Sequence, residues 1–296
     1  MSLVVTGASG FVGRHVVARA REAGLEVLGL VRGGDVVLAE GARRARIPAL
    51  EPAALAPHFE GASAVVHLAN IGVERNGARF EEVNAGGTRS VIEAARRAGA
   101  GRVVYLSGLG VTAWGRSRRV SNRYFLSKLE SEVALFASGL EVAVLRPSFI
   151  LGPGGELVGD VARELREGRV EIVGDGAYRL QPVAVGDAAD AVLAAATREA
   201  PWPLVIDLVG PEPIRYRDFV ARVAARLDTP RWSVRRLPVE EAERLAAGPG
   251  YRGMGPEALD CLLCDEVAAA APLEGLLGRR LQPLDAMIDA ALPEAG

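Results

Sequence analysis

The 296-residue sequence predicts an α/β fold with a doubly wound parallel sheet, on the basis of three observations. Short apolar runs typical of buried strands alternate with longer segments of helical periodicity. A glycine-rich turn joins the first apolar run to the first helical segment. The second half mixes shorter elements after a glycine-rich loop at 152–155. We therefore expect a sheet domain over residues 1–150. Residues 151–296 should partly complete the sheet and form a small C-terminal substrate lobe.

The first strand, turn and helix have the pattern of a pyrophosphate-binding loop. An apolar run at residues 3–5 predicts a strand buried on both faces, and residues 14–23 contain no helix-breaking residue. Gly7 allows a tight turn, Gly10 lets the backbone approach the phosphates, and Gly13 lets the helix pack against the strand. The helix N-terminus adds free N–H groups and a partial positive charge. We therefore predict a Rossmann dinucleotide site that includes Gly7, Gly10, Phe11, Val12 and Gly13.

The elements that follow keep the alternation of strand and helix. Strands are predicted at residues 25–31, 46–50, 62–69, 102–106 and 141–145, and helices at 52–59, 80–98 and 122–138. Later elements are helices at 156–167, 187–198, 216–227, 239–247 and 283–291, an extended segment at 183–185, and strands at 204–208 and 232–237. His67, inside the fourth strand, is expected to be buried and hydrogen-bonded rather than catalytic.

Composition limits the classes of partner. The formal net charge is −2, which provides no electrostatic basis for binding nucleic acid or an anionic membrane surface. No apolar run is long enough to span a membrane, and the first residues predict a strand rather than a signal peptide, so we expect a cytoplasmic protein. Cys261 and Cys264 have apolar neighbours and no second cysteine pair or nearby histidine. We therefore expect them to pack in the fold rather than to form a metal site.

The residue at the end of the second strand indicates which dinucleotide binds. An acidic residue near this position bonds the ribose 2′-hydroxyl of NAD, whereas an arginine favours the 2′-phosphate of NADP. Arg32 occupies this position, and we therefore expect NADP. Asp35 lies three residues further on and could fold back toward the ribose, which keeps NAD as the alternative.

Tyr124 and Lys128 are four residues apart on the helix predicted after the fifth strand, so they lie on one helical face. An ammonium beside a phenol favours the phenolate, which suits the tyrosine for proton transfer, and the same ammonium can bond ribose hydroxyls. Lys128 is the only lysine among 35 basic residues, so arginine serves wherever else a cation is needed. We predict that Lys128→Arg damages cofactor binding or turnover and barely affects stability, as for a partly exposed charge.

Several segments of the sequence form a set. They are the loop 6–13, the strand end 67–69, the run 84–88, the Tyr124/Lys128 pair, and segments 146–148, 174–176 and 182–187. As a set they resemble the extended or atypical short-chain dehydrogenase/reductase superfamily over most of the chain. The resemblance implies NAD(P)-dependent acid–base chemistry on a small alcohol, carbonyl or nucleotide sugar. It also implies that Leu50, Leu68, Ala69 and Asn84 lie near the cofactor and that Pro147 lies beside the nicotinamide.

Two departures from that pattern bear on catalysis. Superfamily members that act on nucleotide sugars place a serine or threonine shortly after the fifth strand as a second donor, for which Ser107 and Thr112 are the candidates here. An arginine that holds the diphosphate is replaced by Leu180, with Arg179 one residue away. The stretches 107–110 and 181–183 look more like the NADPH-binding accessory subunit of respiratory complex I and its bacterial relatives.

Two functions therefore stay open. The first is an NAD(P)-dependent oxidoreductase or epimerase in which Tyr124 and Lys128, with Ser107 or Thr112, act on a small molecule. The second is a non-catalytic NADP(H)-binding protein, structural or redox-sensing, that docks on a larger assembly. We favour the enzyme, as a monomer or homodimer, because both Tyr124 and Lys128 are present.

Overall fold

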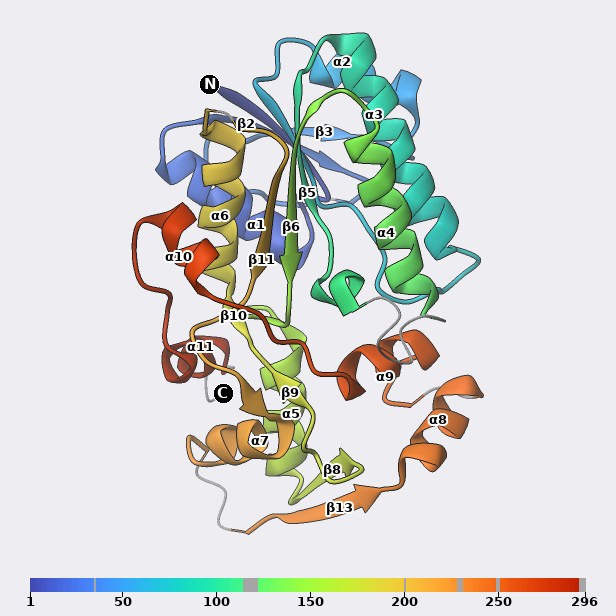
Figure 1. The fold of residues 1–296 in the computed structure, drawn as a ribbon, viewed down its shortest axis with the longest axis vertical. Helices are drawn as coiled ribbons and strands as arrows, with labels where there is room; N and C mark the ends of the chain where they lie inside the picture. The colour runs from blue at the N-terminus through green and yellow to red at the C-terminus, as the bar shows by residue number, and fades with distance from the viewer. Residues whose placement is uncertain (35, 114–121, 200, 228–230, 249–250, 293–296) are drawn as a thin grey trace.

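The computed structural model describes residues 1–296 except 35, 114–121, 200, 228–230, 249–250 and 293–296. Within these residues, seven parallel strands form one sheet in the order β11-β6-β5-β4-β1-β2-β3 (Figure 1). The strands are β1 (Ser2–Thr6), β2 (Glu26–Val31), β3 (Arg43–Arg46), β4 (Ala64–His67), β5 (Arg102–Leu106), β6 (Glu141–Pro147) and β11 (Leu204–Leu208). The chain adds β2 and β3 on one side of β1, and then β4, β5 and β6 on the other. This reversal is the doubly wound arrangement, so the predicted α/β Rossmann fold is confirmed.

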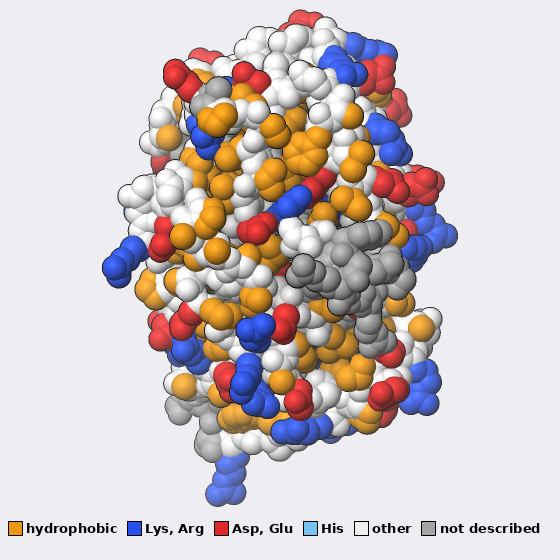
Figure 2. Space-filling model, in the orientation of Figure 1, with side chains coloured by type: hydrophobic (Ala, Val, Ile, Leu, Met, Phe, Trp, Pro, Cys, Tyr) orange, Lys and Arg blue, Asp and Glu red, His pale blue; other side chains and the backbone are white. Residues whose placement is uncertain are grey.

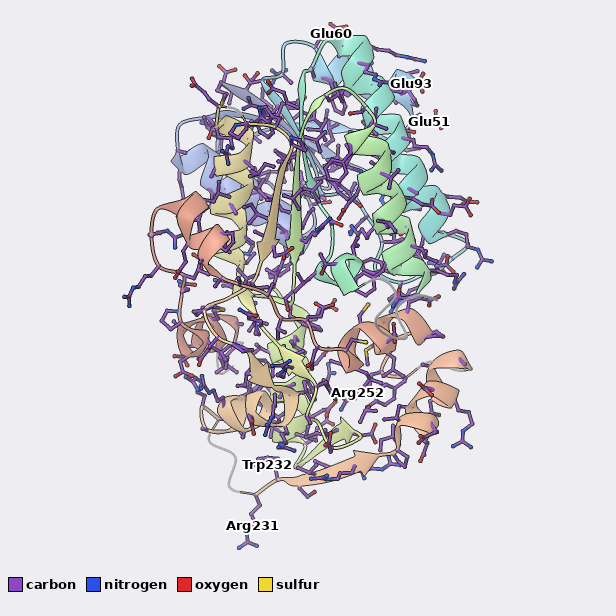
Figure 3. All side chains as sticks on the ribbon, viewed as in Figure 1. Glu51, Glu60, Glu93, Arg231, Trp232 and Arg252 are labelled. Atoms are coloured by element: carbon purple, nitrogen blue, oxygen red, sulfur yellow. The ribbon has the colours of Figure 1, made fainter. Side chains whose placement is uncertain are left out.

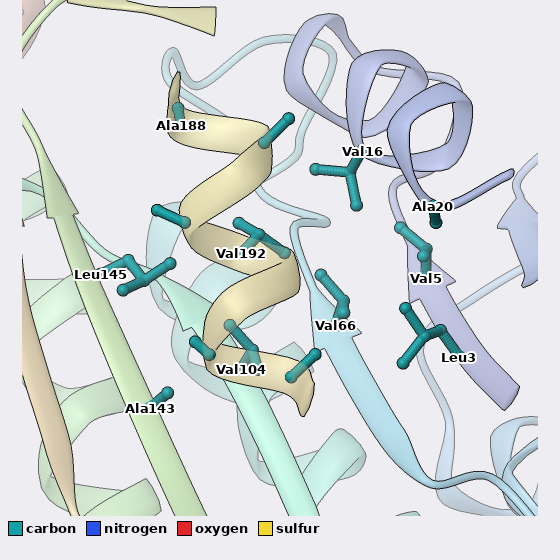
Figure 4. Packing of buried hydrophobic residues seen from close by; sticks show 14 of the residues in the cluster. Leu3, Val5, Val16, Ala20, Val66, Val104, Ala143, Leu145, Ala188 and Val192 are labelled. Atoms are coloured by element: carbon teal, nitrogen blue, oxygen red, sulfur yellow. The ribbon is translucent and has the colours of Figure 1, made fainter. Parts of the chain in front are cut away.

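Helices cover both faces of the sheet. One face carries α1 (Phe11–Glu22), α6 (Val185–Thr197) and α10 (Ala271–Leu277), and the other carries α2 (Pro52–Phe59), α3 (Gly87–Ala98) and α4 (Arg123–Phe136). Figure 4 shows Val16 of α1 and Val192 of α6 packed against the strands around Val66. Burying such a side chain contributes about 1.5–3 kcal/mol relative to leaving it exposed. This packing fixes the N-terminus of α1 against the end of β1.

The second half of the chain returns to the sheet and also forms a lobe below it (Figure 1). Strand β11 pairs with β6, and α6 packs on α1. The lobe contains three two-stranded sheets: β7 (Ile150–Leu151) with β10 (Val183–Ala184), β8 (Arg169–Val173) with β13 (Ser233–Leu237), and β9 (Arg179–Leu180) with β12 (Ile214–Arg215). Its helices are α5 (Glu156–Arg166), α7 (Tyr216–Ala224), α8 (Val239–Ala247), α9 (Pro256–Leu263) and α11 (Leu284–Ala291).

Polar contacts also hold the lobe together. Arg252, labelled inside the lobe in Figure 3, forms an ion pair with Glu164 of α5 and donates to the backbone oxygen of Glu171 in β8 at 3.0 Å. Arg231, also labelled there, projects from the far end of the lobe. The lobe therefore combines its own apolar core with a surface arginine that joins a helix to a strand.

Several elements differ from the expectation, among them β3, the start of α3, and β8. Strand β3 begins at Arg43 instead of residue 46, because Arg43 to Arg46 pair with β2 and form the polar edge of the sheet. A strand with three arginines has no apolar alternation that would reveal it in the sequence. The helix predicted at 80–98 begins as a π-helical segment, η1 (Glu81–Gly86), before α3. Strand β8 was not expected, and it pairs with β13 away from the main sheet.

The surface carries charges of both signs. On the face shown in Figure 2, arginine side chains are interspersed with aspartate and glutamate. Among the residues that the structure describes, no helix has both the length and the apolar character needed to cross a bilayer.

Candidate cofactor and active site

A cavity of about 700 Å³ opens at the carboxyl ends of β1, β2 and β4. In open α/β sheets, ligands bind at this place, beyond the carboxyl ends of the strands where the strand order reverses. Nine of the predicted cofactor residues line the cavity: Gly7, Gly10, Phe11, Val12, Gly13, Arg32, Leu50, Leu68 and Ala69. The cavity also extends to Leu106 at the end of β5. It is therefore large enough, and long enough along the sheet edge, for an extended ligand.

Gly7 and Gly13 of the glycine loop have no room for a side chain. Gly7 adopts a φ of +71°, and a Cβ there would lie 2.7 Å from the backbone nitrogen of Ala69. A Cβ on Gly13 would lie 2.1 Å from the carbonyl oxygen of Gly7. Gly10 is the N-cap of α1, with no capping side chain and no acidic residue in the first turn. The first amides of α1 are therefore left for an anion at the cavity wall, which fits the pyrophosphate of a dinucleotide.

Two arginines stand at the β2–β3 end of the cavity. Arg32 is exposed, lines the cavity and forms no ion pair with any residue that the structure describes. Arg46 lies opposite Val31 in the sheet, and its Nε donates to the carbonyl oxygen of Arg32 at 3.3 Å. Asp35, the acidic alternative, lies outside the described residues. Sequence reasoning missed Arg46, because only the pairing of β3 with β2 brings it beside Arg32.

Lys128 is fully buried under the carboxyl end of β5. Its Nζ donates to the carbonyl oxygen of Leu106 at 3.0 Å and lies 5.6 Å from the centre of the Tyr124 ring. Burial lowers the pKa of Lys128 to about 7, although the carboxylate of Glu132 acts in the opposite direction. The expectation of a partly exposed lysine is therefore wrong: the helical face that carries Lys128 packs against the sheet.

Tyr124 is close to Lys128, but its pKa is raised rather than lowered. Burial of the phenol is the main cause, and Cys261, Tyr105 and Glu266 add to it. Loss of hydration therefore outweighs the effect expected from the ammonium. The Lys128 Nζ is engaged with the Leu106 carbonyl oxygen. A phenol in this environment keeps its proton at neutral pH and can act as a proton donor.

The two candidate second donors direct their protons elsewhere. Ser107 is buried, and its Oγ donates to Oε1 of Glu132 at 2.5 Å. Thr112 is exposed, and its Oγ1 donates to the carbonyl oxygen of Leu109 at 2.8 Å. Neither hydroxyl proton is directed at Tyr124, so the structure does not bring a second donor of this kind to the tyrosine.

Asn84 organises the site without lining the cavity. It is buried in η1, where its Oδ1 accepts from the Ile71 amide at 2.9 Å and its Nδ2 donates to Ser127 Oγ at 3.1 Å. Asn84 therefore joins the loop after β4 to the helix that carries Tyr124 and Lys128. π-helical turns are rare, and those that occur within helices are frequently found at functional sites. Pro147 ends β6, opposite Leu208 of β11.

His67 is buried and hydrogen-bonded, as predicted. Its Nδ1 lies 2.8 Å from Thr6 Oγ1, and its Nε2 lies 3.1 Å from Thr88 Oγ1. Burial, assisted by the charge of Lys128, lowers the pKa of His67 to about 3. The imidazole is therefore neutral at physiological pH and serves as an internal link between β1, β4 and α3.

The residues at the position of a diphosphate-binding arginine are engaged within the protein. Arg179 binds Asp265 through Nε and Nη2 at 2.9 and 2.8 Å, and Leu180 is buried. Gln181 donates to the Gly210 carbonyl oxygen at 2.8 Å and is buried as well. The structure thus uses Arg179 to hold the loop after α9.

Cys261 and Cys264 belong to the end of α9 and are both half-buried. Asn122, the N-cap of α4, donates through Nδ2 to Cys261 Sγ at 3.6 Å. In the described part of the chain, no three histidine, cysteine or acidic residues gather as a metal site. The cysteines thus contribute to the contact between α9 and the start of the helix that carries Tyr124.

Comparisons with known proteins agree with this arrangement. Residues 3–206 match the NAD dependent epimerase/dehydratase family. The chain is similar to 2-alkyl-3-oxoalkanoate reductase of Stenotrophomonas maltophilia (strain K279a), with 29% identity over 254 residues that cover 78% of this chain and 77% of the reductase. It is 34% identical to ceramide reductase of Caulobacter vibrioides (strain NA1000 / CB15N) over 155 residues, which cover 51% of this chain and 47% of that protein.

The fold is similar to that of UDP-glucose 4-epimerase from Thermotoga maritima, with a TM-score of 0.78, 20% identity, and coverage of 98% of this chain and 97% of the epimerase. These proteins give no support for grouping the chain with the complex I accessory subunit.

Proposed function

Because the chain belongs to the NAD dependent epimerase/dehydratase family, we propose that it is an NADPH-dependent reductase of a small ketone or aldehyde. The observation that carries the proposal is the position of Lys128. The only lysine of the chain is buried at the Leu106 end of the cofactor cavity, one helical turn from Tyr124. A buried ammonium is costly, so its presence at this point indicates a ligand that needs it.

The residues of the site fit a carbonyl reduction. A bound NADPH supplies a hydride to the carbonyl carbon of the substrate. Tyr124 donates its phenolic proton to the carbonyl oxygen, because its raised pKa keeps the phenol protonated until the oxygen becomes basic. The Lys128 ammonium stabilises the negative charge then left on the phenolate oxygen and bonds the ribose hydroxyls. The hydride and the proton together convert the carbonyl to an alcohol.

NADPH is the proposed cofactor because of Arg32 and Arg46. Arg32 lines the cavity, Arg46 is bonded to the Arg32 backbone beside it, and neither has an ion-pair partner among the described residues, so both are candidates to bind a 2′-phosphate. Arg32→Ala and Arg46→Ala should each weaken NADPH binding about tenfold or more and leave NADH binding unchanged. Arg43→Ala is the control, since Arg43 is on the same strand with its side chain on the opposite face from Arg46. Equal affinities of the wild type for NADPH and NADH, measured by fluorescence titration, would contradict the preference.

The proposed substrate has a carbonyl group and no nucleoside diphosphate. Arg179 is bound to Asp265, so no arginine at that position is left for a diphosphate. Two relatives, named 2-alkyl-3-oxoalkanoate reductase and ceramide reductase, support a substrate with an apolar chain. NADPH oxidation should be measured with a panel of 3-oxoalkanoates, long-chain ketones and UDP-sugars. The wild type should reduce one of the ketones, and Tyr124→Phe should lose at least about a hundredfold in kcat.

A second candidate is an NADP(H)-binding protein without turnover. The hydrogen bond from Ser107 to Glu132 favours it, because this bond leaves Tyr124 without the expected second donor. On this alternative, NADPH binds with one molecule per chain, and no carbonyl compound in the panel is reduced. The same titration and turnover assays therefore decide between the two candidates.

A further inference from the structure

Glu132 is a buried carboxylate one helical turn beyond Lys128. Both of its oxygens are used: Oε1 accepts from Ser107 Oγ at 2.5 Å and from Arg146 Nε at 3.0 Å, and Oε2 accepts from Arg146 Nη2 at 2.6 Å. The two-point contact with Arg146 is the strong geometry for a guanidinium and a carboxylate. Lys128 and Glu132 are four residues apart in the sequence, so both lie on one face of α4.

The three bonds of Glu132 connect α4 to the ends of two neighbouring strands. Ser107 directly follows β5, whose last residue, Leu106, provides the oxygen that holds Lys128 Nζ. Arg146 directly precedes Pro147 in β6. Glu132 therefore fixes the carbonyl that orients Lys128 and the backbone next to Pro147. A carboxylate bound in this way explains why the Ser107 hydroxyl does not face Tyr124.

The charge on Glu132 also acts on Lys128 directly. The Lys128 ammonium has no carboxylate bonded to it among the described residues, and Glu132 is the carboxylate that favours its charged form. The guanidinium of Arg146 partly offsets the negative charge of Glu132, and the carboxylate of Asp207 in β11 helps to raise the pKa of Arg146. The titratable and charged groups around Lys128 are Tyr124 and Glu132 on α4, His67 on β4 and Tyr105 on β5. Arg146 on β6 and Asp207 on β11 face Glu132.

We propose that Glu132 is a positioning residue of the nicotinamide end of the site, which keeps Lys128 charged and oriented for the ribose hydroxyls. The inference rests on the proposed cofactor site. It does not need turnover, since its measured quantity is NADPH affinity. Only the charged form of Lys128 would bind the ribose well, so affinity falls as pH rises past the pKa of this group in the free protein, which is about 7.

The experiment compares Glu132→Gln with the wild type in NADPH titrations at pH 6 and pH 8.5. The amide keeps the size of the side chain and loses its charge, so the pKa of Lys128 should fall further, by about one unit. The variant should then bind NADPH about tenfold more weakly than the wild type at pH 8.5 and within about twofold at pH 6. The ratio of the variant's NADPH affinity to that of the wild type at each pH cancels the effect of ionisation of the cofactor's phosphate, because that ionisation is the same in both titrations. Glu130→Gln is the matched control, because Glu130 is on the same helix, half-exposed, and faces Arg89 at 3.9 Å.

A second variant distinguishes the effect of the lost Glu132 charge on Lys128 from damage to the fold. Glu132→Gln leaves Arg146 charged without its partner, which lowers the pKa of Lys128 further and strains the fold. The double variant Glu132→Gln/Arg146→Gln removes both charges, so its affinity at pH 8.5 should lie between those of the single variant and the wild type. The double variant also provides the test if the single variant does not give a cooperative melt.

The outcomes distinguish this inference from the proposed function. Affinity reduced by the same factor at both pH values would mean that Glu132 is only structural, and unchanged affinity would mean that it has no role; either result overturns the inference. If the pH-dependent loss is found and no carbonyl compound is reduced, the inference stands and the proposed reductase activity fails. Wild-type protein that does not bind NADPH at either pH would overturn both.

Discussion

Replacing Lys128 by methionine should make the protein more stable and a poorer binder of NADPH. The pKa of Lys128 falls from an ordinary 10.5 to about 7 on folding, because burial disfavours the charged form. Between these two values the unfolded chain binds more protons than the folded one, so this lysine's contribution to stability rises with pH over the window 7 to 10.5. At pH 7 the buried lysine costs about 4 kcal/mol relative to a neutral side chain, at about 1.4 kcal/mol for each pH unit.

Methionine has a similar length and removes that cost. It also removes the donor to the Leu106 carbonyl oxygen, which costs about 1–3 kcal/mol if the oxygen stays unpaired. The net gain at pH 7 is about 2 kcal/mol, which corresponds to an increase in Tm of about 4 °C for a chain of this size. At pH 10 the wild-type lysine is neutral when folded and its cost has largely disappeared. The lost hydrogen bond then dominates, and the variant should melt at or below the wild-type temperature.

Lys128→Arg should act in the opposite direction on stability. The guanidinium keeps its proton, so the buried charge remains, and its larger fork overpacks the space under β5 at a cost of about 1–3 kcal/mol. This corrects the earlier expectation of an almost neutral exchange, because the side chain is buried rather than partly exposed. Both variants should weaken NADPH binding.

Thermal melts at pH 7 and pH 10, with NADPH titrations at pH 7, measure these effects. Leu129→Met, at a half-buried position of the same helix, is the control and should change the stability by less than about 1.5 kcal/mol. The reasoning would be refuted if Lys128→Met melted below the wild type at pH 7, or if the difference in Tm were the same at both pH values. Wild-type affinity for NADPH in both variants would show that Lys128 does not touch the cofactor.

Three further results are expected. Gly13→Ala should abolish NADPH binding and lower the Tm, because the new Cβ would lie 2.1 Å from the carbonyl oxygen of Gly7. Gly101→Ala is the control, since a Cβ there would have no atom within 4 Å, and this variant should bind NADPH as the wild type does in the same titration. Ser107→Ala should reduce kcat far less than Tyr124→Phe, because the serine proton is directed at a buried carboxylate; equal losses in the turnover assay would restore the serine as a second donor. Arg179→Ala should leave the KM for a ketone within about twofold, since the side chain is occupied by Asp265, and a large rise in KM would place Arg179 in the substrate site.

The local parts of the fold and site were predictable because their causes are local. Close approach of the helix to the loop requires the absence of a Cβ, so the positions of Gly7 and Gly13 reveal the turn without any knowledge of the rest of the chain. Buried parallel strands show as apolar runs, and helical periodicity puts Tyr124 and Lys128 on one face. The edge strand β3 was predicted at residues 46–50 rather than at Arg43–Arg46 for the same reason, since an exposed strand of arginines leaves no apolar signal.

The sequence by itself thus determined the doubly wound sheet, the dinucleotide loop and the Tyr124/Lys128 pair. The tertiary structure alone decided that Lys128 is buried, that Arg46 stands beside Arg32, and that the Ser107 proton goes to Glu132, 25 residues away. These outcomes depend on which strand ends and which helical face meet in the folded chain. A pKa depends on water excluded by distant segments, and a hydroxyl turns to the strongest acceptor within reach, so neither can be read from neighbours along the sequence.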